Sequence, residues 1–406
     1  MKRKFIKKWI FFFALLCFNL FMSLKTSFPS YYFLFWSLLA LISISSIWLL
    51  LMFLAPKPHI SRKFNLRIEE DDFLDIRLEI KNTSFLPVFD LVLEDYLACA
   101  LPKERQKFIV FDFLGPNSFK KLQYRCLCPQ RGKYHLGPIN AYFFDPLGIF
   151  YFRVKYHVVS ELYVYPRTFR IRKFPQLNKG SSPWMGIETS RVSGDDDEFY
   201  GVREYRRGDP IKRIHWMASA RKNQLIVKEF QRQSFFRATL LFNLEKDDNF
   251  GQGKESVAEY TIKIAASVAK YLIDLGVCIE LISHAGEVVH IPFNKGEAHL
   301  EEILKFLTIA QPESRITLLE LFETFHRNVA EDSSLIVIMT DRNQVFLPAM
   351  LSLGVRNVSL IPVILNSGSF IKIEETTEKT VPVDISEKIK FNPISISCGE
   401  NLEEKF

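Results

Sequence analysis

The sequence lacks the short motifs that mark the commonest catalytic and nucleotide-binding sites. It contains no G-X-X-X-X-G-K-[ST] phosphate loop, no H-E-X-X-H metal helix and no G-X-S-X-G nucleophile elbow. His215 has no serine, cysteine or carboxylate at a recognisable triad spacing, so we expect it to have a structural role. These absences argue against the familiar hydrolase, metalloprotease and P-loop NTPase classes.

Cysteine is also scarce, with six residues in a chain of 406. Only Cys126 and Cys128 are close in sequence, and Cys-X-Cys in a strand places both thiols on one face, which suits a metal ion. No second cysteine pair or histidine cluster completes a tetrahedral site by spacing. We therefore expect reduced thiols and no metal ion there.

Apolar residues are concentrated at the N-terminus, where part of the excess of phenylalanine lies. After a basic start, residues 9–24 form one apolar run and residues 31–55 a second, longer run. The second run is long enough to span a hydrocarbon core of roughly 30 Å. A cleaved signal peptide is the alternative for the first run, but no small-X-small cleavage site follows it. The pattern favours a transmembrane hairpin, followed by a domain boundary at residue 56.

The charges that flank the two runs predict their orientation. Lys and Arg gather before the first run and again after residue 55, whereas the loop between the runs carries only Lys25. Since positive flanks stay inside, both ends and the whole soluble part are expected in the cytoplasm. The protein is thus predicted to be a two-pass protein of the inner or cell membrane.

Residues 57–166 alternate apolar and polar side chains in short stretches separated by turn signals. Short strands at roughly 8–12-residue spacing predict an antiparallel, β-sandwich-like domain. The Asp145-Pro-Leu-Gly string is interpreted as a structural turn. Residues 167–197, rich in Pro, Gly and Ser and closing on three aspartates, are predicted to be a linker.

Within residues 198–366, the part that begins near residue 238 alternates strand and helix patterns. This alternation predicts a doubly wound, mainly parallel α/β sheet. A helix is expected over 255–275, between strands near 238–244 and 277–282. Ligands of such sheets sit at the carboxyl ends of the strands, where Asn243 and Asp341 fall. Residues 367–406 are polar and are expected to form a loosely ordered tail.

Residues 198–232 carry nine Lys or Arg against four Asp or Glu, a balance of +5 in a chain of net charge +7. Asp209 is the expected N-cap of a helix that begins at Pro210. Two interpretations stay open: the arginines dock an acidic partner, or they pair internally with carboxylates of the same stretch, including Glu229. Tyr205 and Trp216 are expected to be anchors against the sheet. The residues of this signature are Arg203, Tyr205, Arg206, Gly208, Asp209, Arg213, His215, Trp216 and Arg221.

The string R-E-Y-R-R-G-D-P-I-K-R-I-H-W, followed by A-S-A-R and L-I-V-K-E-F, resembles the bacterial family catalogued as domain of unknown function 58. The resemblance implies a partner, because such proteins are commonly encoded beside MoxR-type AAA+ ATPases. No nucleic-acid partner is expected, and the oligomeric state is left open.

The α/β region is also similar to a von Willebrand factor A domain. Such domains bind a divalent ion through Asp-X-Ser-X-Ser, a distant Thr and a later Asp. The corresponding residues here are Asn243, Glu245, Asp247, Thr317 and Asp341. Asn and Glu break the ligand pattern, so we expect no working Mg²⁺ site and no other cofactor.

These observations together predict a membrane-anchored, cytoplasmic, non-catalytic adaptor. It would partner a MoxR-type AAA+ ATPase in envelope-related or complex-maturation processes. The alternative is a metal-dependent adhesion module or an enzyme of envelope biogenesis.

Overall fold

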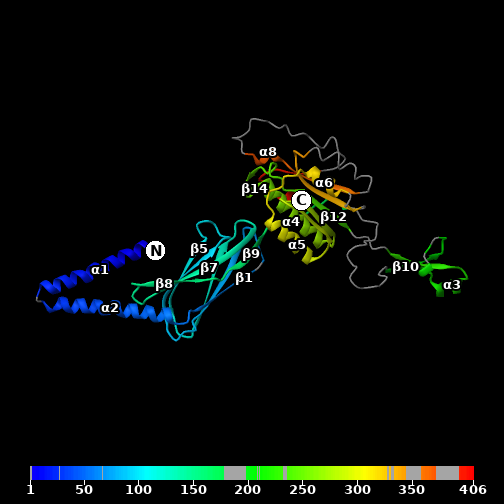
Figure 1. Ribbon diagram of the computed structural model, residues 1–406. Helices are drawn as coiled ribbons and strands as arrows, with labels where there is room; N and C mark the ends of the chain where they lie inside the picture. The colour runs from blue at the N-terminus through cyan, green and yellow to red at the C-terminus, as the bar shows by residue number, and fades with distance from the viewer. Residues whose placement is uncertain are drawn as a thin grey trace. The chain divides into compact units, whose positions relative to one another are not determined.

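The computed structural model of the protein describes residues 2–26, 28–65, 67–177, 198–207, 209, 211–231, 236–326, 329–330, 333–343, 358–371 and 393–406. The chain divides into two compact units, Met1–Tyr165 and Pro166–Phe406. Figure 1 shows the course of the chain through them. The acidic run 195–197, Gly208 and Pro210 lie outside the described residues.

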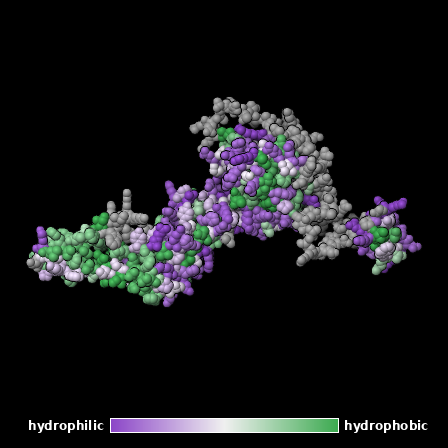
Figure 2. Space-filling view, viewed as in Figure 1, coloured by the Kyte–Doolittle hydropathy of each residue, from purple (hydrophilic) through white to green (hydrophobic). Residues whose placement is uncertain are grey.

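The first unit begins with two helices, α1 (Lys2–Lys25) and α2 (Pro29–Leu54). Among the described residues, α2 is the one helix long and apolar enough to cross a membrane. The apolar part of α1, Ile10–Lys25, is shorter. Apolar residues dominate the visible surface of both helices in Figure 2. The structure therefore supports one candidate membrane span where the sequence predicted two.

The last turns of α2 pack against the β domain that follows it. The Ser45 hydroxyl donates a hydrogen bond to the buried carboxylate of Asp145. Further along the helix, the Trp48 and Phe89 ring centroids lie 5.7 Å apart. Met52 is 5% exposed and belongs to the β-domain core. One side of the C-terminal part of α2 is thus covered by the β domain, while Leu50 and Leu54 remain exposed.

In the part of the chain that the structure describes, the β domain contains nine strands in two sheets. The strands are β1 (His59–Phe64), β2 (Arg67–Glu69), β3 (Phe73–Lys81), β4 (Val88–Leu97), β5 (Gln106–Leu114), β6 (Phe119–Leu127), β7 (Gly132–Phe144), β8 (Tyr151–Tyr156) and β9 (Ser160–Tyr165). One sheet has the order β1-β3-β6, and the other β2-β9-β7-β4-β5 with β8 beside β7. The pairing is antiparallel except for β2 and β9, which run parallel. The sequence predicted a wholly antiparallel sandwich, and this prediction is wrong for the β2–β9 pair.

A buried ion pair connects the two sheets. Arg62 of β1 contacts Asp95 of β4, and the Tyr124 hydroxyl of β6 donates to the same carboxylate. Burial raises the pKa of Asp95, while the Arg62 charge and the Tyr124 hydrogen bond oppose that rise. If either partner lost the other, a charge would stay buried without compensation, which is strongly destabilising. The pair therefore favours the packing of the two sheets that brings Arg62 and Asp95 together.

The second unit is built on a six-stranded sheet of order β16-β15-β12-β17-β18-β19. Its strands are β12 (Arg237–Asn243), β15 (Cys278–His284), β16 (Val288–Asn294), β17 (Ser334–Thr340), β18 (Ser359–Leu365) and β19 (Ile394–Ile396). All neighbours are parallel except β15 and β16. Every residue of β15 and β17 is buried, as expected for central strands covered on both faces.

Helices cover this sheet. They are α4 (Val257–Asp274), α5 (Glu297–Ile309), α6 (Leu318–Phe325) and α8 (Ser367–Phe370), with α9 (Leu402–Lys405) near the C-terminus; β13 (Gly251–Gln252) and β14 (Glu255–Ser256) form a small hairpin. The Ser256 hydroxyl caps α4, which is why that helix begins two residues later than predicted. Leu321 and Phe322 of α6 pack with Leu241 and Val337 of the sheet.

The predicted linker and tail are both partly folded onto the second unit. The Phe169 N–H donates to the Ser267 hydroxyl of α4 at 3.0 Å. The Arg172 N–H donates to the Phe406 carbonyl at 2.8 Å, and the Phe406 side chain is 1% exposed. The expectation of a loose tail is thus wrong for residues 393–406, because a few apolar side chains anchor a polar stretch. Residues 178–197 and 372–392 lie outside the described residues.

Candidate functional site

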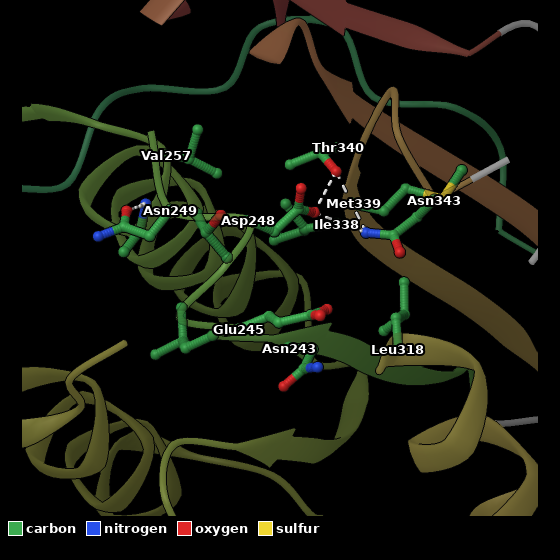
Figure 3. Close-up of a pocket in the computed structure, with 13 residues that line it drawn as sticks. Asn243, Glu245, Asp248, Asn249, Val257, Leu318, Ile338, Met339, Thr340 and Asn343 are labelled. Carbon is green, nitrogen blue, oxygen red and sulfur yellow. Dashed lines mark hydrogen bonds between the residues drawn. The ribbon is translucent and has the colours of Figure 1, made fainter. Parts of the chain in front are cut away.

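A small pocket with both polar and apolar lining lies at the carboxyl edge of the α/β sheet, where β12 ends at Asn243 and β17 at Thr340. These neighbouring strands lie where the strand order reverses direction, which is where ligands of doubly wound sheets bind. The cavity measures about 20 Å³, enough for one water molecule or one small ion. Figure 3 shows its lining side chains.

Asp248 is the centre of the hydrogen bonds in this pocket. Its Oδ2 accepts from the Thr340 hydroxyl and, at 2.9 Å, from Asn343 Nδ2. Asn343 Nδ2 also lies 3.1 Å from the Thr340 oxygen, so the three side chains form a closed set (Figure 3). Burial raises the pKa of Asp248, although the Thr340 hydrogen bond and the Arg342 charge oppose the rise. The pocket therefore holds an acidic group that resists ionisation.

Glu245 is a second acidic group lining the same pocket. Burial raises the pKa of Glu245, and the negative charges of Asp248, Asp247 and Glu320 raise it further. The Asp248 charge thus makes ionisation of Glu245 less favourable. A cation between the two groups would relieve this repulsion.

The structure brings together only part of the predicted ion site. Asn243 and Glu245 line the pocket, but Asp247 is exposed and Asp248 takes the inward position. Asn243 Nδ2 donates to the Ile316 carbonyl at 2.6 Å, and its buried Oδ1 has no hydrogen-bond partner. Asp248, Thr340 and Asn343 are pocket residues that the sequence did not indicate.

The other two predicted ligands, Thr317 and Asp341, do not line the pocket and form hydrogen bonds outside it. Thr317 is the N-cap of α6 and forms a capping box with Glu320. Asp341 Oδ1 accepts the Ser367 N–H at 3.0 Å. The described residues therefore do not reproduce the expected A-type ligand set, although two carboxylates and the Asn243 oxygen are ligands that hard cations use.

The basic signature forms a separate local element, which we call the signature hairpin: β10 (Glu198–Glu204), the 3₁₀ turn η1 (Ile211–Arg213), α3 (Trp216–Lys222) and β11 (Ile226–Gln231). The two strands pair antiparallel. The helix begins later than predicted, because His215 is its N-cap and accepts the Ala218 N–H through Nδ1 at 3.2 Å. This contact gives His215 a structural role.

Arg203 and Asp209 form a bidentate ion pair inside the signature hairpin, with N–O distances of 2.6 and 2.7 Å. The same carboxylate accepts the Arg206 N–H at 2.8 Å. The Arg203 hydrogen bonds, and then the Arg206 N–H, lower the pKa of Asp209 to about 2. For Arg203 the internal-pairing interpretation therefore holds, and Asp209 closes the turn instead of capping a helix.

Ser219 joins α3 to β11 and was not singled out from the sequence. Its hydroxyl donates to the His215 carbonyl at 2.9 Å and accepts the Ile226 N–H at 2.9 Å. It is 8% exposed. The A-S-A-R string thus contains a buried hydroxyl that attaches the short helix to its strand.

Several large apolar and basic side chains of the signature hairpin are exposed. Trp216 is 64% exposed, Met217 71% and Ile211 69%. Trp216 is therefore not the predicted anchor against the sheet, because α3 directs it to solvent. Tyr205 is half-buried, while Arg206, Arg213 and Arg221 are exposed. Figure 2 shows apolar and hydrophilic residues side by side on this element.

A family of known proteins matches the region that contains the pocket and most of the signature hairpin. Residues 201–364 match the family described as "Protein of unknown function DUF58". A protein of Bacillus subtilis (strain 168) named "Uncharacterized protein YeaD" is 25% identical over 260 residues. That match covers 60% of this chain and 60% of the relative, so the alignment spans less than two thirds of that protein.

Solved structures give weaker likenesses. The CARDB domain of the PF1109 protein from Pyrococcus furiosus is 18% identical, covering 27% of this chain and 94% of that domain with a TM-score of 0.19. The putative ApaA protein from Bordetella pertussis is 14% identical, covering 27% of this chain and 95% of that one, also at 0.19. Both TM-scores are too low to assign a fold to this chain.

Proposed function

Because residues 201–364 of this chain match the DUF58 family, we propose that the protein is a membrane-anchored, non-catalytic interaction module. In this proposal the signature hairpin docks a protein partner. The observation that carries the proposal is the exposure of Trp216 and Met217 beside exposed arginines. Large apolar side chains exposed next to charged ones are typical of interaction sites.

The composition of the signature hairpin suits a binding hot spot. Trp and Arg are over-represented among the residues whose truncation costs most at interfaces. The Arg203–Asp209 pair and the Ser219 hydrogen bonds hold the hairpin in shape before a partner arrives. A pre-ordered surface loses less entropy on binding than a flexible one. An acidic partner surface with an apolar pocket for Trp216 would complement it.

We propose that the α/β part is a von Willebrand factor A-like module. The doubly wound strand order and the acidic loop after β12 support this assignment. We also propose that α1 and α2 cross the membrane together and place both soluble units in the cytoplasm. The basic residues on the outer flanks support that orientation.

The proposed partner is a MoxR-type AAA+ ATPase, for which this chain would serve as an adaptor. A photo-crosslinking residue placed at Met217 of the full-length chain in native membranes tests this. We expect a crosslink to the ATPase from Met217 and none from Leu147, an equally large, exposed apolar position in the first unit. Absence of an ATPase adduct from Met217 contradicts the proposed partner.

The paired carboxylates support a second candidate, a cation-dependent adhesion module. Calorimetric titration of the full-length chain with Mg²⁺ separates it from the first. Binding tighter than ~10 µM, or roughly 7 kcal/mol, that is lost in Asp248→Asn and kept in Asp341→Ala would favour this alternative. Asp341 is a suitable control, because its Oδ1 accepts the Ser367 N–H.

A further inference from the structure

Three of the six cysteines meet at one end of the β domain. Cys126 lies in β6 and Cys128 directly follows it, whereas Cys99 lies in the turn after β4. Because β4 and β6 belong to different sheets, the cluster bridges the sandwich. The three sulfur atoms lie within 4.8 Å of one another. All three residues are buried: Cys99 is 2% exposed, Cys126 4% and Cys128 0%.

The spacing of these sulfur atoms suits one metal ion. Zinc binds thiolate sulfur at about 2.3 Å, so three thiolates around one zinc stand about 3.8–4.0 Å apart. Sulfur atoms already within 4.8 Å need only small side-chain movements to reach that arrangement. Three thiols meeting by chance in an apolar core would gain little from one another, because free cysteine packs as a small hydrophobe.

Hydrogen bonds among the three thiols shift their pKa values in different directions, and they raise the pKa of Cys99. Hydrogen bonds from Cys128 and Cys99 lower the pKa of Cys126 well below its usual range, and the Lys107 charge adds to this. The pKa of Cys128 is raised, first by its hydrogen bond to Cys126 and further by the nearby Asp72 charge. The three thiols thus interact with one another as well as lying close together, and the proximity of their sulfur atoms is what suits a metal ion.

We propose that Cys99, Cys126 and Cys128 form a structural site for a thiophilic divalent ion of the zinc class. Binding breaks three S–H bonds, forms three metal–sulfur bonds and releases three protons to solvent, with no change of oxidation state. Within the described residues, no histidine or carboxylate joins the three sulfur atoms at that distance. The ligands that the described residues supply are thus the three thiolates. This inference is independent of the partner proposed above.

Metal analysis of the full-length chain, purified under reducing conditions after growth with zinc, tests the proposal. We expect about one zinc ion per chain, falling at least about tenfold in Cys99→Ser and in Cys126→Ser. Cys278→Ser is the matched control, because Cys278 is equally buried but lies in β15 of the other unit. Its zinc content should equal that of the wild type.

A second measurement needs no variant and so does not depend on whether the variants fold. Co²⁺ added to the metal-free wild-type chain should produce a thiolate-to-cobalt charge-transfer band that zinc abolishes. Absence of that band overturns the proposal, as does full zinc content in both Cys99→Ser and Cys126→Ser. A disulfide among these cysteines in freshly purified protein, found by mass spectrometry after alkylation, also overturns it.

Discussion

The Ser45 hydroxyl of α2 donates a hydrogen bond to the Asp145 carboxylate in the turn after β7. The same carboxylate accepts the N–H groups of Leu147 at 3.1 Å and Phe150 at 2.6 Å. Asp145 therefore closes its own turn and holds the candidate membrane helix against the β domain. This gives the Asp-Pro-Leu-Gly string a purpose beyond forming a bend: it couples anchor and domain.

Replacing Ser45 with alanine should weaken this coupling, because a buried carboxylate loses one of its donors. We expect a loss of about 1–3 kcal/mol of unfolding free energy, measured by thermal melting of the full-length chain in detergent. Ser46→Ala is the matched control, since the Ser46 hydroxyl is exposed and bonds only within its helix, to the Ile42 carbonyl. Equal melting of the two variants would contradict the coupling.

The proposed orientation predicts a cytoplasmic C-terminus. Alkaline phosphatase and a fluorescent protein, fused there in separate constructions, report opposite sides of the membrane. We expect a fluorescent fusion and an inactive phosphatase, because basic flanks are retained inside. An active phosphatase with a dark fluorescent fusion would reverse the assignment.

Glu245→Gln should stabilise the second unit at neutral pH. The folded pKa of Glu245 is raised, so its contribution to stability is present below its unfolded pKa, near 4.3, and is lost as pH rises through the folded value. The variant removes that loss, by at most about 1 kcal/mol after solvent screening. Melting curves should therefore differ at pH 7 and converge near pH 4. A difference that grows on acidification would show that the sign is wrong.

Ser219→Ala should loosen the signature hairpin, because the Ile226 N–H loses its acceptor. The cost should be about 1–3 kcal/mol, seen as faster hydrogen exchange in peptides covering residues 211–231. Thr324→Ala is a suitable control, since that exposed helical hydroxyl bonds only to the Glu320 carbonyl. Unchanged exchange in Ser219→Ala would mean that other contacts hold α3 in place.

Periodic features were predictable from the sequence, and positions fixed by distant contacts were not. The helix expected over 255–275 is α4 (Val257–Asp274), because its apolar residues repeat at helical spacing over several turns. In the loop after β12, a bridge between Glu245 and Ser314 helps to fix the chain, and Asp248 lines the pocket instead of Asp247. No local pattern records a contact of that kind.

The cysteine cluster shows the same limit. Cys126 and Cys128 are close in sequence, at the end of β6 and just after it, but Cys99 reaches them only when two different sheets pack together. Composition misled in the opposite direction for Trp216 and Phe406. Trp216, an aromatic residue in a basic stretch, was expected to be a buried anchor but is exposed. Phe406, which lies in a polar tail, is buried.

The affinity of the purified full-length chain for the MoxR-type ATPase tests whether the signature hairpin docks this partner. Arg206 and Arg221 are exposed on the signature hairpin, so changing both to Glu should replace attraction with repulsion. Each lost contact is worth roughly 1–3 kcal/mol, and the wild-type affinity should fall as salt rises. The matched control changes Arg77 and Arg170, which are exposed outside the hairpin, to Glu.

We expect the Arg206/Arg221 double variant to melt like the wild type and to bind the ATPase at least about tenfold more weakly, a difference of about 1.4 kcal/mol. The Arg77/Arg170 control should bind normally. Wild-type affinity in the Arg206/Arg221 variant, or no measurable binding by the wild-type chain at low salt, would contradict the claim that the signature hairpin docks this partner.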